Sequence, residues 1–470
     1  MSDRYDQLMK NKSIRELQEA MLRGDFTCVE LVEYYLERIA KYNDRVHAIL
    51  FLNKNALEEA KAADMRLRKG DHVRPLEGIP VVVKDCINVV GMPVAEASNC
   101  VYAFPTEDAS FIKKIREAGA IFLAKTNLTE FAMGGMGNSS RGGQTTNPFD
   151  FTRTAGGSSS GSAVSVACDF AAVAIGSDTI NSLRSPACST SVIGMRPTHG
   201  SLRNLGSLPC KPSQDICGPM GRTVDDIARV LTVMNDLDEE LTAYERMTSF
   251  EGCTFGLLRQ LLSDDEDVNA VVDASIKAIE AKGGKVVDFE MPEINVKYLT
   301  DNYDMGNYGV YDQMNPYVEK LFGMTVEEIR DANKACPEVQ KRLEGACAAK
   351  GQGAEIIREK LERKEVLTKK VSDQMDAMGV DALLYPHQSY LIAKIGDPAQ
   401  QRGRNGIVAA ITGFPAIVIA GGFSKPDENA PIGVPIGIEI SCKAYEEKKM
   451  FALAQLLDET LCARKLPVLD

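Results

Sequence analysis

The sequence has no tryptophan, only four histidines in 470 residues, and no apolar run long enough to cross a membrane. Few candidates for a Ser-His-Asp triad therefore exist, and no histidine lies in a nucleophile-elbow context. The N-terminus, MSDRYDQLMKNKS, lacks the apolar core of a signal peptide. These absences predict a protein without a membrane span or secretory leader, and the cytoplasm is its expected location.

Basic residues are too few and too dispersed for a nucleic-acid-binding surface. Lys and Arg number 54 against 66 Asp and Glu, which gives a formal net charge of −12. Because phosphate contacts need clustered Lys and Arg, we expect no nucleic-acid partner. The 12 cysteines form no CxxC pair and have no metal-like spacing with histidine. The sequence therefore predicts buried reduced thiols, no metal site and no cofactor.

The patterning of apolar residues predicts an α/β chain. Ser13 and Thr27 each begin a capping-box pattern before an amphipathic run, and a third helix is expected at residues 56–67. The apolar run GIPVVVKD then predicts a buried strand, followed by a helix at 109–118 and a second strand. This order of strand, helix and strand indicates a parallel or mixed sheet with helices on its faces.

The segment 153–197 carries most of the chemical information in the sequence. A Gly/Ser loop at 156–162 precedes small and apolar residues, 163–172, that predict a buried helix. A short apolar strand at 173–175 then leads into a second polar turn, GSDTINS. We expect the two serine-bearing turns to lie side by side, with the positive end of the helix directed at the first loop.

Three residues in these segments match the motifs of a known family. Lys84 ends the apolar run of GIPVVVKD, Ser158 lies in AGGSSSGS, and Ser182 lies in GSDTINSLR. These strings resemble GIPVxVKD, GGSSGGS and GTDTGGSIR of the amidase signature family of serine hydrolases. The resemblance continues through SPACSTSVIGMRPTHG and SQDICGPMGRTVDD. It implies an amidase built as a single α/β/α domain, with a twisted mixed β-sheet core covered by helices.

The resemblance also implies the chemistry. A neutral Lys84 takes a proton from Ser158, which is on a cis peptide in the family, and Ser158 takes one from Ser182, which attacks the carbonyl. The implied substrate is a small amide, ureide or carbamate, and a homodimer fits the family. Backbone amides of the nucleophile turn form the implied oxyanion hole, and one loop supplies substrate contacts. The oxyanion residues are Thr179, Ile180, Asn181 and Ser182, and the substrate contacts are Ala132, Met133 and Gly134.

One departure from the family pattern lies directly before the nucleophile. The family has two glycines there, whereas this chain has Ile180 and Asn181. A β-branched residue with positive φ would be strained, so we expect Ile180 to keep a negative φ. We also expect the Asp85 carboxylate to point away from Lys84, because a facing carboxylate would favour the charged amine.

The rest of the chain contributes fewer motifs. We expect one amidase domain over residues 1–470, made of N-terminal helices (1–70), the signature core with the triad (71–248), a variable elaboration at the substrate pocket (249–370) and a C-terminal return to the core sheet (371–470). Six residues are further candidates for the pocket, with ordinary packing or a solvated loop as the alternative: Tyr303, Tyr308, Tyr311, His387, Arg402 and Arg404. The two arginines are candidates for binding a substrate carboxylate.

Two other functions remain open. The first is the glutaminase subunit of a tRNA-dependent amidotransferase, which shares the triad, although the chain lacks a stretch like that subunit's LLGTYALSAGYYDAYY. The second is a catalytically degenerate binding protein on the same fold, suggested by Ile180 and Asn181. A phosphate-binding loop is excluded because no GK[ST] follows the glycines.

Overall fold

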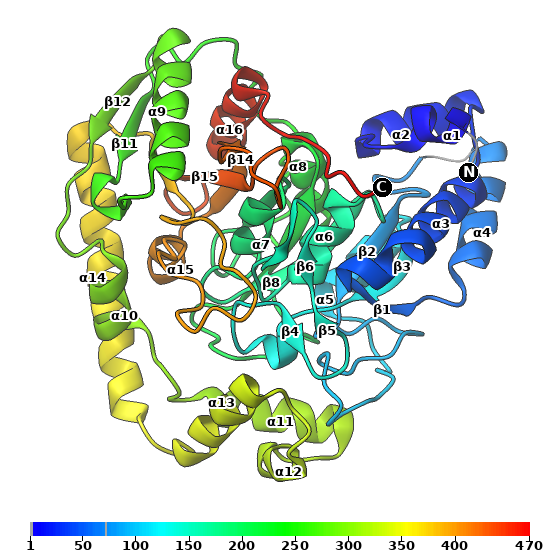
Figure 1. The fold of residues 1–470 in the computed structure, drawn as a ribbon, viewed down its shortest axis with the longest axis horizontal. Helices are drawn as coiled ribbons and strands as arrows, with labels where there is room; N and C mark the ends of the chain where they lie inside the picture. Colours follow the sequence, from blue (N-terminus) through cyan, green and yellow to red (C-terminus); the bar gives the residue numbers. More distant parts are fainter. Residues whose placement is uncertain (1–2, 71–72) are drawn as a thin grey trace.

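The computed structural model describes residues 3–70 and 73–470, and in these residues the chain forms one 11-stranded mixed sheet flanked by helices (Figure 1). In sheet order the strands are β1 (Ile49–Leu52), β3 (Ile121–Thr126), β2 (Pro80–Lys84), β8 (Val173–Asp178), β10 (Ile216–Gly221), β9 (Ile193–Arg196), β14 (Ala416–Phe423), β15 (Pro435–Ser441), β13 (Ala382–Pro386), β11 (Thr254–Leu257) and β12 (Lys285–Asp288). The expected fold class is confirmed.

The helices alternate with the strands along much of the chain. They are α1 (Asp3–Met9), α2 (Ile14–Arg23), α3 (Cys28–Val46), α4 (Ala56–Arg68), α5 (Ser110–Glu117), α6 (Ser160–Ala167), α7 (Arg184–Ser189), α8 (Val224–Met234), α9 (Glu266–Ala281), α10 (Val296–Tyr303), α11 (Val310–Phe322), α12 (Val326–Ala332), α13 (Pro337–Ala348), α14 (Ala354–Met378), α15 (Ile407–Thr412) and α16 (Glu447–Leu461). Among the described residues, no helix combines the length and apolar character needed to span a membrane.

The N-terminal helices form where the capping patterns predict them. Ser13 and Thr27 are the N-caps of α2 and α3, and each makes both hydrogen bonds of a capping box, with Glu16 and Glu30. The third expected helix is α4. These helices bury one apolar face each, which is the packing role that their periodicity indicates.

Strands β2 and β8 set the position of the site. All five residues of β2 are buried, as a continuous apolar run in a central strand requires. Strand β2 pairs in parallel with β3 and with β8, with Val83 opposite Ile175. Because parallel strands end at the same edge of a sheet, Lys84 and the turn after Asp178 lie at one edge.

The segment between the two serine-bearing turns differs from its predicted bounds. The helix, expected at 163–172, is α6, Ser160–Ala167, and it begins inside the Gly/Ser loop. It ends earlier because the chain reverses at Asp169, whose φ is 59°. The strand expected at 173–175 continues to Asp178, since β10 pairs with β8 as far as Ile216 opposite Asp178.

The last strands of the chain lie in the middle of the sheet. Strand β14 pairs antiparallel with β9, and β15 pairs antiparallel with β14 and β13. Beyond β13 the sheet continues through β11 and β12. Strands β13, β14 and β15 thus lie in the same sheet as β2 and β8.

Residues 249–370 form a mostly helical region at the periphery. In Figure 1, α11, α12 and α13 lie together at the bottom, and α14 runs along the left side past α10 toward β11 and β12. The loop after β3 forms two short hairpins, β4 (Asn138–Ser139) with β5 (Gly143–Gln144) and β6 (Thr146–Asn147) with β7 (Asp150–Thr154). Single turns of 3₁₀-helix occur at η1 (Glu130–Ala132) and η2 (Arg259–Leu261).

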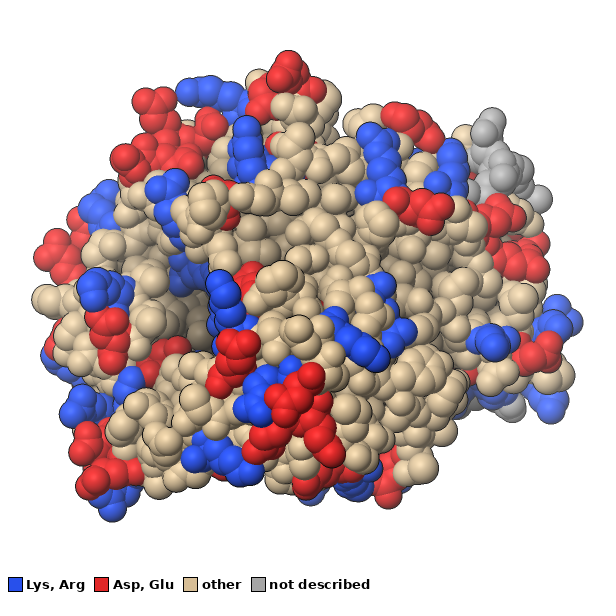
Figure 2. Space-filling view, turned by 60° about the horizontal axis from the view of Figure 1, so that its bottom comes forward, with Lys and Arg blue, Asp and Glu red and all other residues tan. Residues whose placement is uncertain are grey.

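Charged side chains are mixed over the surface. Figure 2 shows acidic and basic groups interspersed across the face that it presents. All 12 cysteines are free thiols. The free thiols agree with the reduced cysteines expected from the sequence.

Candidate active site

Lys84 is fully buried at the end of β2 and contacts two serine hydroxyls. Its Nζ lies 2.7 Å from Oγ of Ser158 and 2.8 Å from Oγ of Ser177. Within the described part of the chain, no carboxylate forms an ion pair with it. Transfer of an ammonium group from water to such an environment is costly without a paired charge. The environment of Lys84 is therefore one of hydroxyl partners only.

The carboxylate of Asp85 points away from Lys84, as expected. It accepts hydrogen bonds from the backbone amides of Ala95 and Ala97, at 3.1 and 2.9 Å, and lies 3.6 Å from Nζ of Lys125. Burial raises the pKa of the Asp85 carboxyl above its ordinary value, and Lys125 opposes that rise. Asp85 thus interacts with Lys125 and two backbone amides and not with Lys84, its neighbour in sequence.

Ser158 is held in a crowded Gly/Ser loop. The peptide bond between Gly157 and Ser158 is cis, and the Ser158 carbonyl accepts a 3.0 Å hydrogen bond from the Thr129 amide. A Cβ at Gly157 would lie only 2.6 Å from Oγ1 of Thr129, so this position needs glycine. The loop thereby directs the Ser158 hydroxyl to Lys84.

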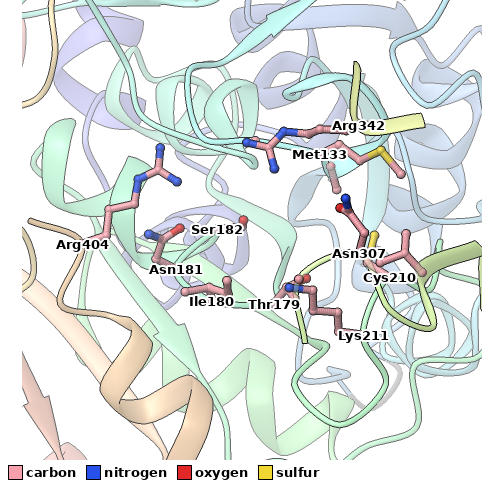
Figure 3. A pocket seen from close by; sticks show the side chains of 14 residues that line it. Met133, Thr179, Ile180, Asn181, Ser182, Cys210, Lys211, Asn307, Arg342 and Arg404 are labelled. Carbon is pink, nitrogen blue, oxygen red and sulfur yellow. The ribbon is translucent and has the colours of Figure 1, made fainter. Parts of the chain in front are cut away.

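Ser182 lies in the turn after β8, next to the Gly/Ser loop. Its carbonyl accepts a 3.0 Å hydrogen bond from the Ser159 amide, so the two serine-bearing turns lie side by side as expected. Its hydroxyl faces a cavity (Figure 3). The structure therefore joins Lys84 directly to Ser158 and brings Ser182 beside that pair through the backbone.

Arg184 anchors the turn that carries Ser182 by a hydrogen bond to its backbone. Its guanidinium donates to the Ile180 carbonyl at 2.6 Å and to the Gly406 carbonyl at 2.9 Å. It also forms ion pairs with Asp178 at the end of β8 and with Glu439 in β15. One fully buried side chain thus links the nucleophile turn to strands from both halves of the chain.

The Asp178 carboxylate completes this network. It accepts hydrogen bonds from the Leu183 amide and from Arg184, and it pairs with Arg196 at 3.0 Å. Burial acts to raise the pKa of Asp178, but the two guanidinium groups outweigh it and hold the pKa below its ordinary value. The carboxylate is therefore charged and acts as the anchor for both arginines.

The predicted oxyanion residues form an open turn. Within the described residues, none of the amides of Thr179, Ile180, Asn181 and Ser182 donates a hydrogen bond to the protein. Ile180 and Asn181 are not among the residues with positive φ, which confirms the expected unstrained backbone at Ile180. These amides have no hydrogen-bond acceptor in the protein, and the oxygen of a ligand in the cavity can accept hydrogen bonds from them.

We expect Ile180→Gly to lower both stability and rate. Because Ile180 has no positive φ to relieve, glycine adds chain flexibility to the loss of the side chain, and relative to alanine it costs about 0.5–1 kcal/mol of unfolding free energy. The rate should fall because the turn amides lose their fixed orientation. Ile180→Ala removes the side-chain packing alone and is the control. Urea unfolding and kcat measured on both variants test this, and a glycine variant more stable than the alanine variant would contradict it.

The cavity that Ser182 faces has a volume of about 140 Å³. The three predicted substrate-binding residues all line it, at the end of η1 and just beyond. Residues from five other segments complete the wall. The lining residues are Ala132, Met133, Gly134, Thr179, Ile180, Asn181, Ser182, Cys210, Lys211, Gly306, Asn307, Val310, Arg342 and Arg404.

The three candidate tyrosines do not line this cavity. Tyr308 packs against Gly353, and Tyr311 is buried against the core and donates a hydrogen bond to Glu327. Their segment instead contributes Gly306, Asn307 and Val310. The sequence predicted the correct segment but not the residues in it that line the cavity. Gly306 and Asn307 precede α11, which begins at Val310, so no helical periodicity indicates that they face inward.

His387 and Arg402 also lie outside the cavity, whereas Arg404 lines it. His387 is fully buried and bonds through Nδ1 to Glu439, which indicates a structural role. Arg402 is exposed and stacks over Tyr390, with its guanidinium carbon 4.6 Å from the ring centre. Sequence reasoning missed Lys211 and Arg342, which belong to no motif.

The chain is similar to enzymes over nearly its whole length. It is 28% identical to native peptide amidase from Stenotrophomonas maltophilia, with a TM-score of 0.87 over 98% of this chain and 99% of that one. An amidase family protein from Bacillus anthracis str. Ames is 26% identical, with a TM-score of 0.86 over 99% of this chain and 94% of that one. Fold and likeness together define a hydrolase of carbon–nitrogen bonds.

A model of one family, described as Amidase, matches residues 30–451. The chain therefore belongs to the amidase family, the amidase signature enzymes that its motifs resemble. Among curated proteins, it is 30% identical to a glutamyl-tRNA(Gln) amidotransferase subunit of Chlorobaculum tepidum, over 97% of this chain and 99% of that protein.

Proposed function

We propose that the chain hydrolyses the carbon–nitrogen bond of a small amide, ureide or carbamate through an acyl-enzyme on Ser182. The observation that carries this proposal is the 2.7 Å contact between the buried Lys84 amine and the Ser158 hydroxyl, beside a turn that exposes Ser182 to a cavity. In this proposal, Ser158 and Lys84 form the path along which a proton leaves the Ser182 hydroxyl.

In the proposed reaction, a neutral Lys84 accepts the Ser158 proton as Ser158 accepts the Ser182 proton. Ser182 Oγ attacks the substrate carbonyl, and the turn amides of residues 179–182 stabilise the negative charge that develops on its oxygen. The proton returns through Ser158 to the leaving amine. Water, deprotonated by the same path, then cleaves the acyl-enzyme. The second contact of Lys84, with Ser177, fixes the amine in position for both steps.

A serine-directed probe tests the nucleophile. A fluorophosphonate is expected to label the purified protein, and mass spectrometry of the digested adduct should find it on Ser182. The Ser182→Ala variant should remain unlabelled. A protein that binds no probe although it is folded would favour the catalytically degenerate alternative suggested by Ile180 and Asn181.

A second candidate function is the glutaminase subunit of a tRNA-dependent amidotransferase. Its support is the similarity to relatives that are named as subunits of glutamyl-tRNA(Gln) amidotransferase. Such a protein would release ammonia from glutamine for a partner and would be inert alone. Ammonia release from small amides by the isolated chain, without glutamine turnover, would exclude it.

We expect the reaction to need no metal ion. In the described residues, no group of three His, Cys, Asp or Glu side chains is arranged to hold one. Dialysis against a chelator should therefore leave the rate of amine or ammonia release unchanged. A rate that falls on dialysis and returns with zinc or manganese would contradict this expectation.

A further inference from the structure

Two arginine side chains extend into the cavity beside Ser182. Arg404 precedes α15, and Arg342 lies in α13. Figure 3 shows both side chains reaching from separate segments toward the opening in which the Ser182 hydroxyl lies. The proposed acyl-enzyme chemistry uses neither of them, so their presence at the cavity needs another explanation.

Arg404 differs from the other two cations of the cavity because it forms no ion pair with a described residue. Its guanidinium makes no hydrogen bond or ion pair with any residue that the structure describes, whereas Arg342 pairs with Glu338 at 3.4 Å. The third cation of the cavity, Lys211, pairs with Asp304 at 2.5 Å. An arginine held only to support the fold would be expected to use its five donors.

The guanidinium of Arg404 packs closely against the backbone of Gly135. A Cβ added to Gly135 would lie 2.9 Å from Nη2 of Arg404. Burial and the like charge of Arg342 lower the pKa of Arg404, Glu338 opposes that shift, and the guanidinium stays charged at neutral pH. Arg404 is half-buried and lines the cavity, so a ligand that enters the cavity can pair with its unpaired guanidinium.

The cavity is small, and none of the side chains that line it is acidic. Its volume of about 140 Å³ is comparable to cavities that hold a benzene-sized molecule. A carboxylate matches the planar fork of guanidinium donors. A ligand of this size that reaches both Ser182 and Arg404 carries its amide and its charge only a few bonds apart.

We propose that Arg404 binds a carboxylate of the substrate, which makes the preferred substrate the monoamide of a short dicarboxylic acid. Arg342 is a second, weaker donor to the same carboxylate, because Glu338 already pairs with it. This inference rests on the proposed hydrolysis at Ser182 and adds the chemical class of the acyl group.

Two amides of equal size test the inference. Succinamate carries a carboxylate where succinamide carries a second neutral amide, and initial rates of ammonia release give kcat/KM for each. The wild-type protein should prefer succinamate. Arg404→Met should lower the preference about 10- to 100-fold, the value of a hydrogen bond to a charged group. Arg402→Met, two residues away at the surface, should leave it unchanged.

The inference fails if Arg404→Met keeps the wild-type preference, or if the wild-type protein prefers succinamide. Failure of the proposed function is a separate result, in which Ser182→Ala still releases ammonia. A second measurement needs no turnover: succinate should bind the Ser182→Ala protein in titration calorimetry and should bind the Ser182→Ala/Arg404→Met protein at least 10-fold more weakly. Equal binding by both proteins would overturn the role of Arg404.

Discussion

Ser182→Ala is expected to lower amide turnover by about 10⁶-fold, the loss seen when a serine nucleophile is removed from a comparable relay. The covalent path disappears, while the fold is little affected, because the Ser182 hydroxyl bonds to no described residue and lies at the cavity. Steady-state kinetics on a small amide and urea unfolding on the same preparation measure the two effects.

Ser165→Ala is the matched control. The Ser165 hydroxyl, in α6, bonds only to the Gly161 carbonyl at 2.6 Å and lies outside the cavity. Its removal should leave the rate close to that of the wild-type protein. Normal turnover by Ser182→Ala, or a covalent adduct on the cavity cysteine Cys210, would assign the chemistry to another residue.

Arg184→Met is expected to cause the largest loss of stability. It leaves the buried carboxylates of Asp178 and Glu439 without their shared partner, and breaking a buried ion pair in this way costs about 3–5 kcal/mol. The substitution also removes the hydrogen bond from Arg184 to the Ile180 carbonyl, which holds the turn before Ser182. The protein that still folds should therefore turn over substrate more slowly. Urea unfolding gives the free energy, and kcat of the folded protein gives the second effect.

Lys369→Met is the control for the loss of a cation. Lys369 pairs with Asp373 at the surface, where water screens the charges. Its unfolding midpoint should stay near that of the wild-type protein. An Arg184→Met protein that unfolds at the wild-type urea concentration would mean that the buried network contributes nothing to stability.

The sequence predicted the elements that follow from local pattern. Capping boxes placed Ser13 and Thr27, and a continuous apolar run placed β2 with Lys84 at its end. Family motifs identified Ser158 and Ser182, and the structure places their two turns side by side. Each of these signals is contained in a short stretch of residues, which is why sequence reasoning could use it.

The cavity wall was harder to predict because it depends on contacts between distant segments. Arg342 and Arg404 come from α13 and from the loop before α15, and no spacing in the sequence relates them. The extent of β8 likewise depends on its partner β10. His387 was a reasonable candidate at the end of a strand, but its bond to Glu439 on the neighbouring β15 turns it away.

The position of β14 and β15 in the middle of the sheet affects biosynthesis. While the ribosome is still adding the C-terminal segment, Lys84, Ser158 and Ser182 have all been made, but the edge of β9 has no partner and Arg184 has no Glu439. About 260 residues separate Ser182 from the end of β15, roughly 13 to 52 s of translation. During that time the nascent chain is expected to present an open strand edge at β9, and we expect the site to be completed only when β14 and β15 are in place.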